Sequence, residues 1–449
     1  MSRVTDMTRG NPAKLMLTFA FPVVLTNLGQ QLYQIVDAAI VGRGVGVDAL
    51  AAVGCTDWTY WLILWSMCVM TSGFATFVSR FFGSRDYAAM NRSIMIMSVL
   101  SAVIAVVLTA AGLILARPLL VFLGTPEEIL DNAVIYLSTM IAGTLVITAY
   151  NLAASILRAF GDGRSPMIAM IFAAILNVAL DLLFVMAFRW GVFGAALASV
   201  LSQLAAFVYC LIKILKIEIV RFDRQNMVWD WKLALEILRF GLPLALQYII
   251  INAGGMIVQS TVNTQGQGFI AGYTAVNKLY GLLECTAISL GNAFTTFTSQ
   301  NYGAKNFRRV RKGVNTSMVL AIGGAAVLMA ITLPLNRWLP QLFIDLKEEG
   351  AAEAVLVASR YLMHMILGLP ILYLVYVHRN SLQAIGVASW SLVSGIFEAL
   401  TRVLFVKVLF DLWGVKVLYY VEPFAWLAAW LFVLVPYYFY ERSRLPVSQ

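Results

Sequence analysis

Long apolar runs recur along almost the whole chain, and they constrain its fold more than any other feature. A transmembrane helix needs about 20 mainly apolar residues to cross the hydrocarbon core of a bilayer. We expect a span at each of twelve runs, namely 15–41, 51–79, 93–116, 129–151, 166–188, 192–214, 238–262, 271–298, 314–336, 355–377, 388–411 and 415–439. The sequence therefore predicts an all-α integral membrane protein with twelve transmembrane helices.

Composition and charge agree with this prediction. Hydrophobic residues make up 61% of the chain and charged residues 12%, a bias that excludes an ordinary soluble domain. The net charge of +9 could indicate a nucleic-acid partner. However, Lys and Arg gather in the connections on one side of the expected spans, among them Lys213, Lys305, Arg308 and Arg379. This pattern marks cytoplasmic loops, so we expect a bacterial plasma-membrane protein with both termini in the cytoplasm and no nucleic-acid partner.

Short motifs of the first half of the chain return in the second half, in the same order and at a nearly constant offset. Three of the pairs are Phe19-Ala-Phe-Pro22 with Phe240-Gly-Leu-Pro243, Ser79-Arg-Phe-Phe-Gly83 with Ser299-Gln-Asn-Tyr-Gly303, and Trp190-Gly-Val192 with Trp413-Gly-Val415. The longest connection, 215–237, separates the two halves and carries mixed charges. We expect an N-terminal lobe at 1–214, a cytoplasmic linker at 215–237 and a C-terminal lobe at 238–449.

The repeat also predicts how the lobes are related. Each lobe has an even number of spans, so both copies enter the membrane from the same side. Repeats of this kind are related by a pseudo-two-fold axis along the membrane normal. Such an arrangement suits alternating access better than it suits a static pore.

Asp37 stands inside the first apolar run. A carboxylate at the centre of a membrane helix costs about 3 kcal/mol to insert, and less near an end. Intramembrane carboxylates usually face the interior of a helix bundle or a wet cavity, where they bind ions or protons. The plainer alternative is a tolerated carboxylate that reaches from the helix end towards water.

Partners for Asp37 follow further along the chain. Asn177 and Asp181 lie on one helix face, since residues four apart are neighbours on a helix. At 1.5 Å per residue, Asp37, Asp181, Tyr136 and Ser199 each lie about 8 to 10 Å from the outer end of their span. Two carboxylates, an amide and a hydroxyl form a hard oxygen set that suits Na⁺ or a shared proton. Alternatively, the neutral groups merely satisfy one buried aspartate, which leaves the second carboxylate unexplained.

The second half carries different intramembrane charges: Lys278 and Glu284 in one span, and Glu398 and Arg402 in another. Glu398 and Arg402 are four residues apart and could pair on their own helix. In the repeat they fall where Asn177 and Asp181 lie in the first half. One interpretation is a structural network that holds helices together, and the other is a set of cavity charges for substrate or a proton relay.

These motifs together resemble the multidrug and toxic compound extrusion (MATE) family over essentially the whole chain. The resemblance rests on Phe21-Pro22, Tyr33-x-x-x-Asp37 with Val41-Gly42, Ala49-Leu-Ala-Ala-Val-Gly54, Arg158-Ala-Phe-Gly-Asp162 with Pro166, Asn177-Val-Ala-Leu-Asp181, and the segment Gly191 to Ser199. The chain looks most similar to the branch of DNA-damage-inducible and staphylococcal-type multidrug exporters.

The resemblance implies a two-lobed exporter in which cation or proton binding in the N-terminal lobe drives efflux of hydrophobic, often cationic compounds. It places the cation site at Asp37, Asn177, Asp181 and Ser199, with Tyr136 as a neighbour. The family often has threonine at the position of Ser199, and serine keeps the hydroxyl. Gln259 is the repeat counterpart of Asp37, so a matching second site is not expected.

We therefore predict a secondary active multidrug antiporter driven by H⁺ or Na⁺, without a cofactor and working as a monomer. The alternative in the same superfamily is a flippase for lipid-linked oligosaccharides, which the acidic first lobe disfavours because the substrate is anionic. A membrane enzyme is a third class. The sequence contains no His-rich metal pattern, no nucleophile motif and no phosphate-binding glycine loop, so no catalytic residues are expected.

Overall fold

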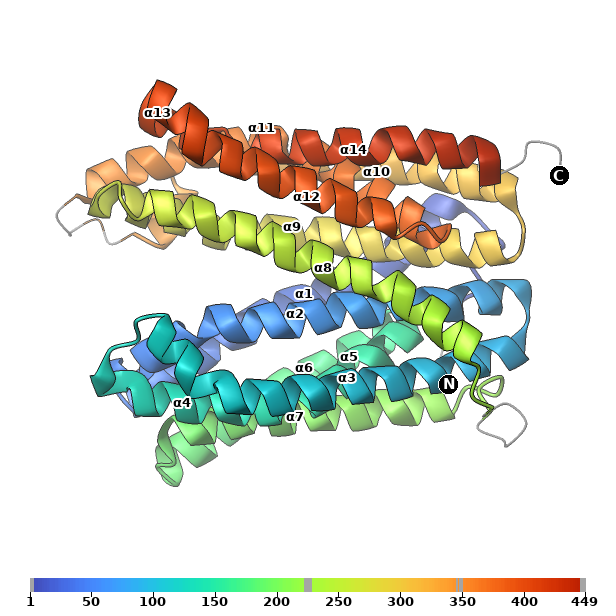
Figure 1. Ribbon diagram of the computed structural model, residues 1–449, viewed down its shortest axis with the longest axis horizontal. Helices are drawn as coiled ribbons and strands as arrows, with labels where there is room; N and C mark the ends of the chain where they lie inside the picture. Colours follow the sequence, from blue (N-terminus) through green and yellow to red (C-terminus); the bar gives the residue numbers. More distant parts are fainter. Residues whose placement is uncertain (1–3, 222–227, 345, 347–349, 445–449) are drawn as a thin grey trace. The chain divides into compact units, whose positions relative to one another are not determined.

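The structure is a computed structural model that describes residues 4–221, 228–344, 346 and 350–444, except for the side chains at 32–35, 47, 50, 57–59, 61 and 442–444. Helices are the only regular secondary structure in this part of the chain, as Figure 1 shows. The helices form two compact units. Unit 1 contains residues 1–7 and 18–245, and unit 2 contains residues 8–17 and 246–449.

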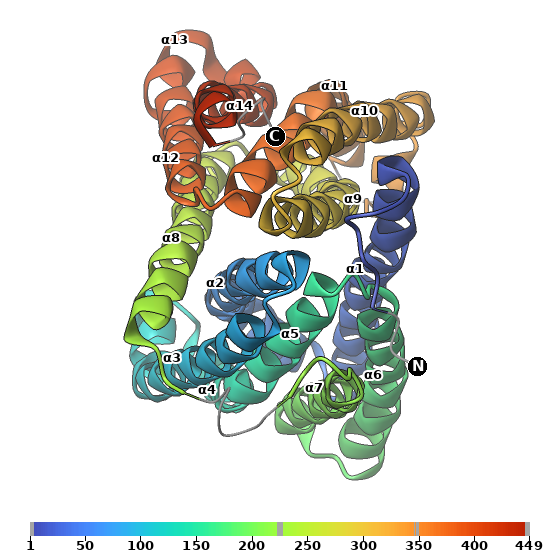
Figure 2. The same ribbon diagram turned by 90° about the vertical axis from the view of Figure 1, so that its right-hand side faces the viewer.

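Unit 1 is built mainly from the first seven α-helices. These are α1 (Pro12–Gly44), α2 (Val47–Ser84), α3 (Tyr87–Phe122), α4 (Glu127–Ala142), α5 (Thr144–Ala159), α6 (Arg164–Asp181) and α7 (Gly191–Leu215), with a π-helix, η1 (Leu182–Ala187), directly after α6. Within the unit, α7 packs against α4, α5 and α6, and α2 packs against α3, α4 and α5. The end-on view in Figure 2 shows α6 and α7 side by side.

Unit 2 repeats this plan with the later helices. It contains α9 (Gln267–Gly303), α10 (Phe307–Thr332), the short 3₁₀ helix η2 (Leu339–Leu342), α11 (Ala351–Ala384), α12 (Ser389–Leu404), the π-helix η3 (Phe405–Leu409), α13 (Phe410–Trp413), η4 (Gly414–Tyr419) and α14 (Val421–Arg444). The helix α8 (Trp231–Val262) passes from unit 1 into unit 2 after Ala245. α11 packs on α9, α10 and α14, and α12 packs on α14.

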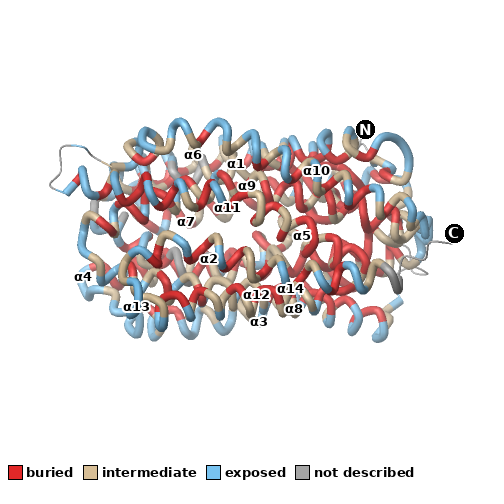
Figure 3. Tube along the Cα trace, turned by 90° about the horizontal axis from the view of Figure 1, so that it is seen from above, coloured by how far each residue is buried: buried red, intermediate tan, exposed pale blue. Residues whose placement is uncertain are grey.

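Nine helices in the described part of the chain are long and apolar enough to cross a membrane. The number rises to ten if the bent pair of α4 and α5 is counted as one span. The prediction of an all-helical membrane protein is therefore confirmed. The expected spans 271–298 and 388–411 fall on α9 and on the segment α12–η3–α13, which is divided because α12 ends after 16 residues where η3 begins. A total of twelve spans stays a prediction. Buried and exposed residues alternate along the long helices, as Figure 3 shows.

A corner built in the same way joins α2 to α3 in unit 1 and α9 to α10 in unit 2. Arg85 and Lys305 have left-handed backbone conformations, with φ of 59° and 56°. The next residues, Asp86 and Asn306, cap the following helices by accepting hydrogen bonds from the backbone N–H of Ala89 and Arg309, respectively. These caps satisfy N–H groups that have no partner within the helix. The internal repeat of the sequence is thus also present in the structure, as two corners with the same backbone conformation and the same type of cap.

Gly143 allows α4 and α5 to meet at a bend of 44° against α7. A Cβ atom at this position would clash with the side chain of Val200 and would lie 3.0 Å from its Cγ1 atom. Replacing Gly143 by Ala should therefore lower stability by about 1 to 3 kcal/mol through overpacking. Thermal unfolding of the purified protein would measure this loss, and Val200→Ala in the same chain should restore most of it. Identical unfolding of Gly143→Ala and the wild type would contradict the close approach.

Candidate functional site

The acidic residues of unit 1 lie on helices that run side by side. A Cβ on Gly163, just before α6, would lie 3.0 Å from the carbonyl oxygen of Phe19 on α1, and a Cβ on Gly44 at the end of α1 would lie 2.9 Å from Cγ1 of Val185 in η1. The two helices therefore run in the same direction and lie close to each other near both ends. Asp37 lies shortly before Gly44 on α1, and Asp181 is the last residue of α6, shortly before Val185. Both carboxylates are therefore close to the contact between Gly44 and Val185.

An apolar cluster sets the depth of the site within unit 1. Val41 and Val185, one turn beyond Asp37 and Asp181, both belong to this cluster, which contains buried residues of η1 and of six α-helices of the unit. On the antiparallel helix α7, Ala195 belongs to it and Ser199 follows one turn later. The two carboxylates and the hydroxyl thus lie in one layer at the edge of the cluster.

All four predicted ion-binding side chains are buried. Asn177 and Asp181 are 0% exposed, Ser199 is 5% exposed and Asp37 is 7% exposed. The Nδ2 atom of Asn177 donates a hydrogen bond to Oγ of Ser199 at 3.3 Å. The carboxyl groups of Asp37 and Asp181 are close enough to share a hydrogen bond when one of them carries a proton. The structure therefore brings these residues together in two interacting pairs.

Several oxygen atoms of this group have no hydrogen-bond partner in the described part of the chain. They are Oδ1 of Asp37, Oδ1 of Asn177, and both carboxylate oxygens of Asp181. Two ionised carboxylates have no proton to share, so neither can satisfy the other. Buried polar atoms are nearly always paired, so this cluster of acceptors is an exception that calls for a proton, a cation or water. Tyr136 on α4 is buried in the neighbouring apolar cluster.

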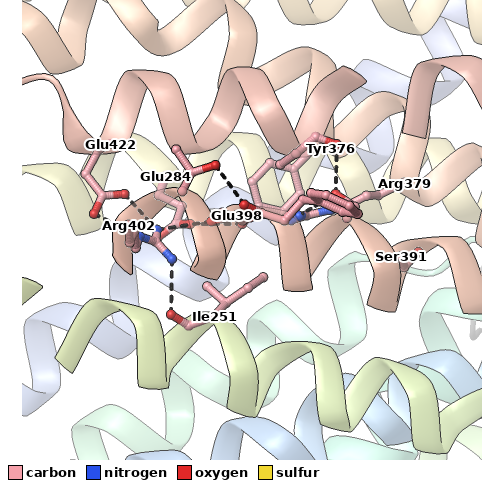
Figure 4. A network of polar contacts seen from close by, with 12 residues as sticks. Ile251, Glu284, Tyr376, Arg379, Ser391, Glu398, Arg402 and Glu422 are labelled. Carbon is pink, nitrogen blue, oxygen red and sulfur yellow. Dashed lines mark hydrogen bonds and ion pairs between the residues drawn. The ribbon is translucent and has the colours of Figure 1, made fainter. Parts of the chain in front are cut away.

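Unit 2 holds a different polar centre, which Figure 4 shows. Nη2 of Arg379 on α11 lies 2.7 Å from Oε2 of Glu398 on α12. Nη2 of Arg402, also on α12, lies 3.0 Å from Oε1 of Glu398 and 2.7 Å from Oε2 of Glu422 on α14. All four side chains are buried. Two guanidinium groups and two carboxylates give a network with no net charge.

Neutral groups complete the network. The Oγ atom of Ser394 accepts hydrogen bonds from Nε and Nη2 of Arg379 at 3.0 and 2.7 Å, and it donates one to the carbonyl oxygen of Ala429 at 2.8 Å. Nearby, the hydroxyl of Tyr376 donates a hydrogen bond to Oε1 of Glu284 at 2.9 Å. The ion pairs thus connect α11, α12 and α14. Because two guanidinium groups face two carboxylates, these ion pairs leave no uncompensated charge of their own inside the apolar bundle.

The family model that matches this chain is that of MatE, over residues 22–183 and 243–408. These two segments cover most of the chain and carry one copy each of the internal repeat. The chain belongs to the MATE family. The family predicted from sequence is thus confirmed, and with it the prediction of a transporter rather than an enzyme.

Individual MATE proteins agree with this assignment. The chain is 33% identical to the probable multidrug resistance protein YpnP of Bacillus subtilis over 305 residues, which is 68% of each chain. It is 22% identical to the multidrug export protein MepA of Staphylococcus aureus, over 71% of each chain. A solved structure of a transporter of the MOP superfamily from Pyrococcus furiosus superposes with a TM-score of 0.88 at 22% identity, over 99% of this chain and 98% of the other. At this identity the superposition shows the fold alone.

One prediction about charges in this MATE protein needs correction. Arg379 was expected in a cytoplasmic connection, but α11 continues to Ala384, so Arg379 lies buried inside the helix and pairs with Glu398. Lys278 lies on α9 with an exposed side chain, and its Nζ atom is 6.0 Å from the ring centre of Phe343. Its role as a cavity or relay charge stays a prediction.

Sequence reasoning also missed three features of the two polar centres. Glu422 was not singled out, although it is a carboxylate in the first turn of an apolar helix, which is a usable signal. The π-helices η1 and η3 follow α6 and α12, and such irregular turns often occur at functional sites. The registers of the two repeats differ here, because Asp181 directly precedes η1 whereas Val403 and Leu404 separate Arg402 from η3.

Proposed function

We propose that this MATE protein is a secondary active multidrug antiporter that couples entry of H⁺ or Na⁺ to export of hydrophobic, often cationic compounds. The observation that carries this proposal is the buried pair Asp37 and Asp181 in unit 1. Oδ1 of Asp37 and both carboxylate oxygens of Asp181 lack hydrogen-bond partners in the described part of the chain. Intramembrane carboxylates in such a setting bind ions or protons. The descriptions of YpnP and MepA as multidrug proteins support the choice of substrate class.

The residues present fit a proton or a small hard cation. Asp37, Asn177, Asp181 and Ser199 would hold it, since they offer carboxylate, amide and hydroxyl oxygens. No group of three or more His, Cys, Asp and Glu side chains gathers anywhere in the described part of the chain, as a transition metal would require. A bound proton or Na⁺ would remove one of the two negative charges of the pair, and its release would restore that charge. This change in charge is what couples the gradient to the movement of the bundle.

We further propose the membrane architecture that this mechanism needs. Twelve spans form an N-terminal lobe at 1–214 and a C-terminal lobe at 238–449, joined by a cytoplasmic linker at 215–237 and related by a pseudo-two-fold axis along the membrane normal. α9 and the α12–α13 segment supply the two spans that composition alone does not identify. Both termini lie in the cytoplasm, where basic connections accumulate. Alternating access then follows from movement of one lobe against the other.

Transport by purified protein in vesicles tests the proposal directly. We expect a fluorescent, hydrophobic cationic dye to be moved against its own gradient only when a pH gradient or a Na⁺ gradient is imposed. Each gradient is tested separately, with empty vesicles as the control. Saturable, gradient-dependent transport supports the antiporter. Absence of dye transport under both gradients, together with translocation of a labelled lipid-linked oligosaccharide, would instead favour the flippase.

A further inference from the structure

The helix α8 is shared by the two units. Its residues up to Ala245 belong to unit 1, and those from Leu246 belong to unit 2. Pro243 lies inside the helix just before this division. A proline has no N–H group and its ring clashes with the preceding turn, so it weakens the helix at that point. α8 therefore has its weakest point close to the place where it passes from one unit to the other.

The first half of α8 is fixed to α2 in unit 1. The ring of Phe240 packs edge-on against Phe77, with ring centres 5.5 Å apart. A Cβ on Gly73 would lie only 2.6 Å from Cδ1 of Leu244, and a Cβ on Gly241 would clash with the ring of Phe74. These close contacts hold the first half of α8 against α2.

The second half of α8 is fixed to α12 in unit 2. A Cβ on Gly395 would lie 2.7 Å from Cγ of Gln247, and a Cβ on Gly254 would lie 3.0 Å from the Cα of Ala399. Small residues therefore let the two helices approach closely, as is usual between membrane helices. Dispersion contacts of this kind hold helices together but allow some slippage, because they have little directionality.

Arg402 adds a directional bond to this contact. Its Nη1 atom donates a hydrogen bond to the carbonyl oxygen of Ile251, in the middle of α8, at 3.1 Å. The same guanidinium group donates to both oxygens of Glu422 at 3.1 and 2.7 Å and to Glu398 at 3.0 Å. Figure 4 shows Arg402 between Ile251 and the two carboxylates. One side chain thus ties α8 to the charge network that connects α11, α12 and α14.

We propose that Arg402 is a positioning residue for transport, which clamps the second half of α8 to unit 2 so that bending is confined to the segment around Pro243. The inference rests on the proposed function, since it assigns Arg402 a role in the conformational change of the antiporter. With the clamp in place, a movement of unit 1 is transmitted through α8 as a bend. Without it, the second half of α8 slips on α12 and the movement is lost.

A double variant separates this role from plain stability. Arg402→Leu together with Glu422→Leu removes one charge of each sign and leaves Glu398 paired with Arg379. Replacing a buried ion pair by apolar residues of similar size often leaves stability unchanged or improves it. The double variant should therefore fold, as judged by thermal unfolding, while the hydrogen bond to Ile251 is gone.

Two readouts are measured on this variant. Spin labels at Met256 and Leu404, both exposed in unit 2, report the distance between α8 and α12 on a background without the four native cysteines. We expect a narrow distance distribution in the wild type and a broad one in the variant. In vesicles, the turnover of the dye should fall about tenfold, while its KM changes little, since the ion site in unit 1 is intact.

Controls make the outcome decisive. Tyr373→Phe removes the hydrogen bond that the hydroxyl of Tyr373 on α11 donates to the carbonyl oxygen of Leu283 on α9 at 3.2 Å. This bond lies in the same unit but outside the charge network, so both readouts should stay at the wild-type level. A narrow distribution in the folded double variant would overturn the proposal. A broad distribution with unchanged turnover would overturn it as well, because α8 would then be loose without consequence. If the wild type does not transport at all, the proposed function fails, whereas the distance measurement still tests the clamp.

Discussion

Replacing Asp37 by Asn should reduce gradient-driven export to the background of empty vesicles while the protein is produced and inserted normally. Asn has the shape of Asp but cannot bind a proton at neutral pH or compensate a cation. The same result is expected for Asp181→Asn, because each carboxylate is buried and the two interact. Export from vesicles and drug resistance of producing cells measure the effect.

The control for this prediction is Asp131→Asn in the same unit. Asp131 forms an exposed ion pair with Arg117 on the surface, at 3.1 Å, and exposed pairs contribute little. This variant should transport like the wild type. Full export by Asp37→Asn or Asp181→Asn would show that the buried pair is structural.

Replacing Glu398 by Ala should cause the largest loss of stability of any single substitution considered. Glu398 is the carboxylate that both Arg379 and Arg402 contact. Among the ion pairs of the described residues, Arg379 has one carboxylate partner, which is Glu398. Removing Glu398 therefore leaves the buried guanidinium group of Arg379 without that partner. Breaking a buried pair in this way costs about 3 to 5 kcal/mol. The apparent Tm of the purified protein should fall by roughly 3 to 5 °C if the chain unfolds as a whole.

The matched control is Asp131→Ala, the same type of change at the exposed pair with Arg117. It should shift the apparent Tm by no more than about 1 °C, since such pairs are worth up to about 1 kcal/mol. An equal, small shift for both variants would mean that the unit 2 network carries no more stability than a surface ion pair.

The acidic centre of unit 1 was predictable because its signals are local. A carboxylate in an apolar run stands out, and helical spacing places Asn177 and Asp181 on one face. Counting residues from the span ends then gives a common depth for Asp37, Asp181 and Ser199. The structure places these side chains in one buried layer. Their assignment as an ion site stays a prediction that the substitutions above test.

The network of unit 2 was only half predictable. Glu398 and Arg402 are neighbours on one helix, so their pairing follows from sequence. Arg379 and Glu422 lie near the ends of apolar runs, where sequence cannot tell a loop charge from a buried one, because helix ends are uncertain by several residues. Their partners come from other helices, and tertiary packing decides such pairs. Tertiary packing also decides that α8 is divided between the two units, so sequence alone could not show this division.

Ion movement itself tests the central claim most directly. In vesicles that contain the purified protein, a dye gradient imposed in the export direction should drive H⁺ or Na⁺ across the membrane in the opposite direction. A pH-sensitive probe or labelled Na⁺ measures this ion movement. The account predicts dye-dependent ion uptake by the wild type and none by the Asp37→Asn/Asp181→Asn double variant. Dye-dependent ion uptake by the double variant at the wild-type rate would contradict it, because the ion would then travel without the buried pair.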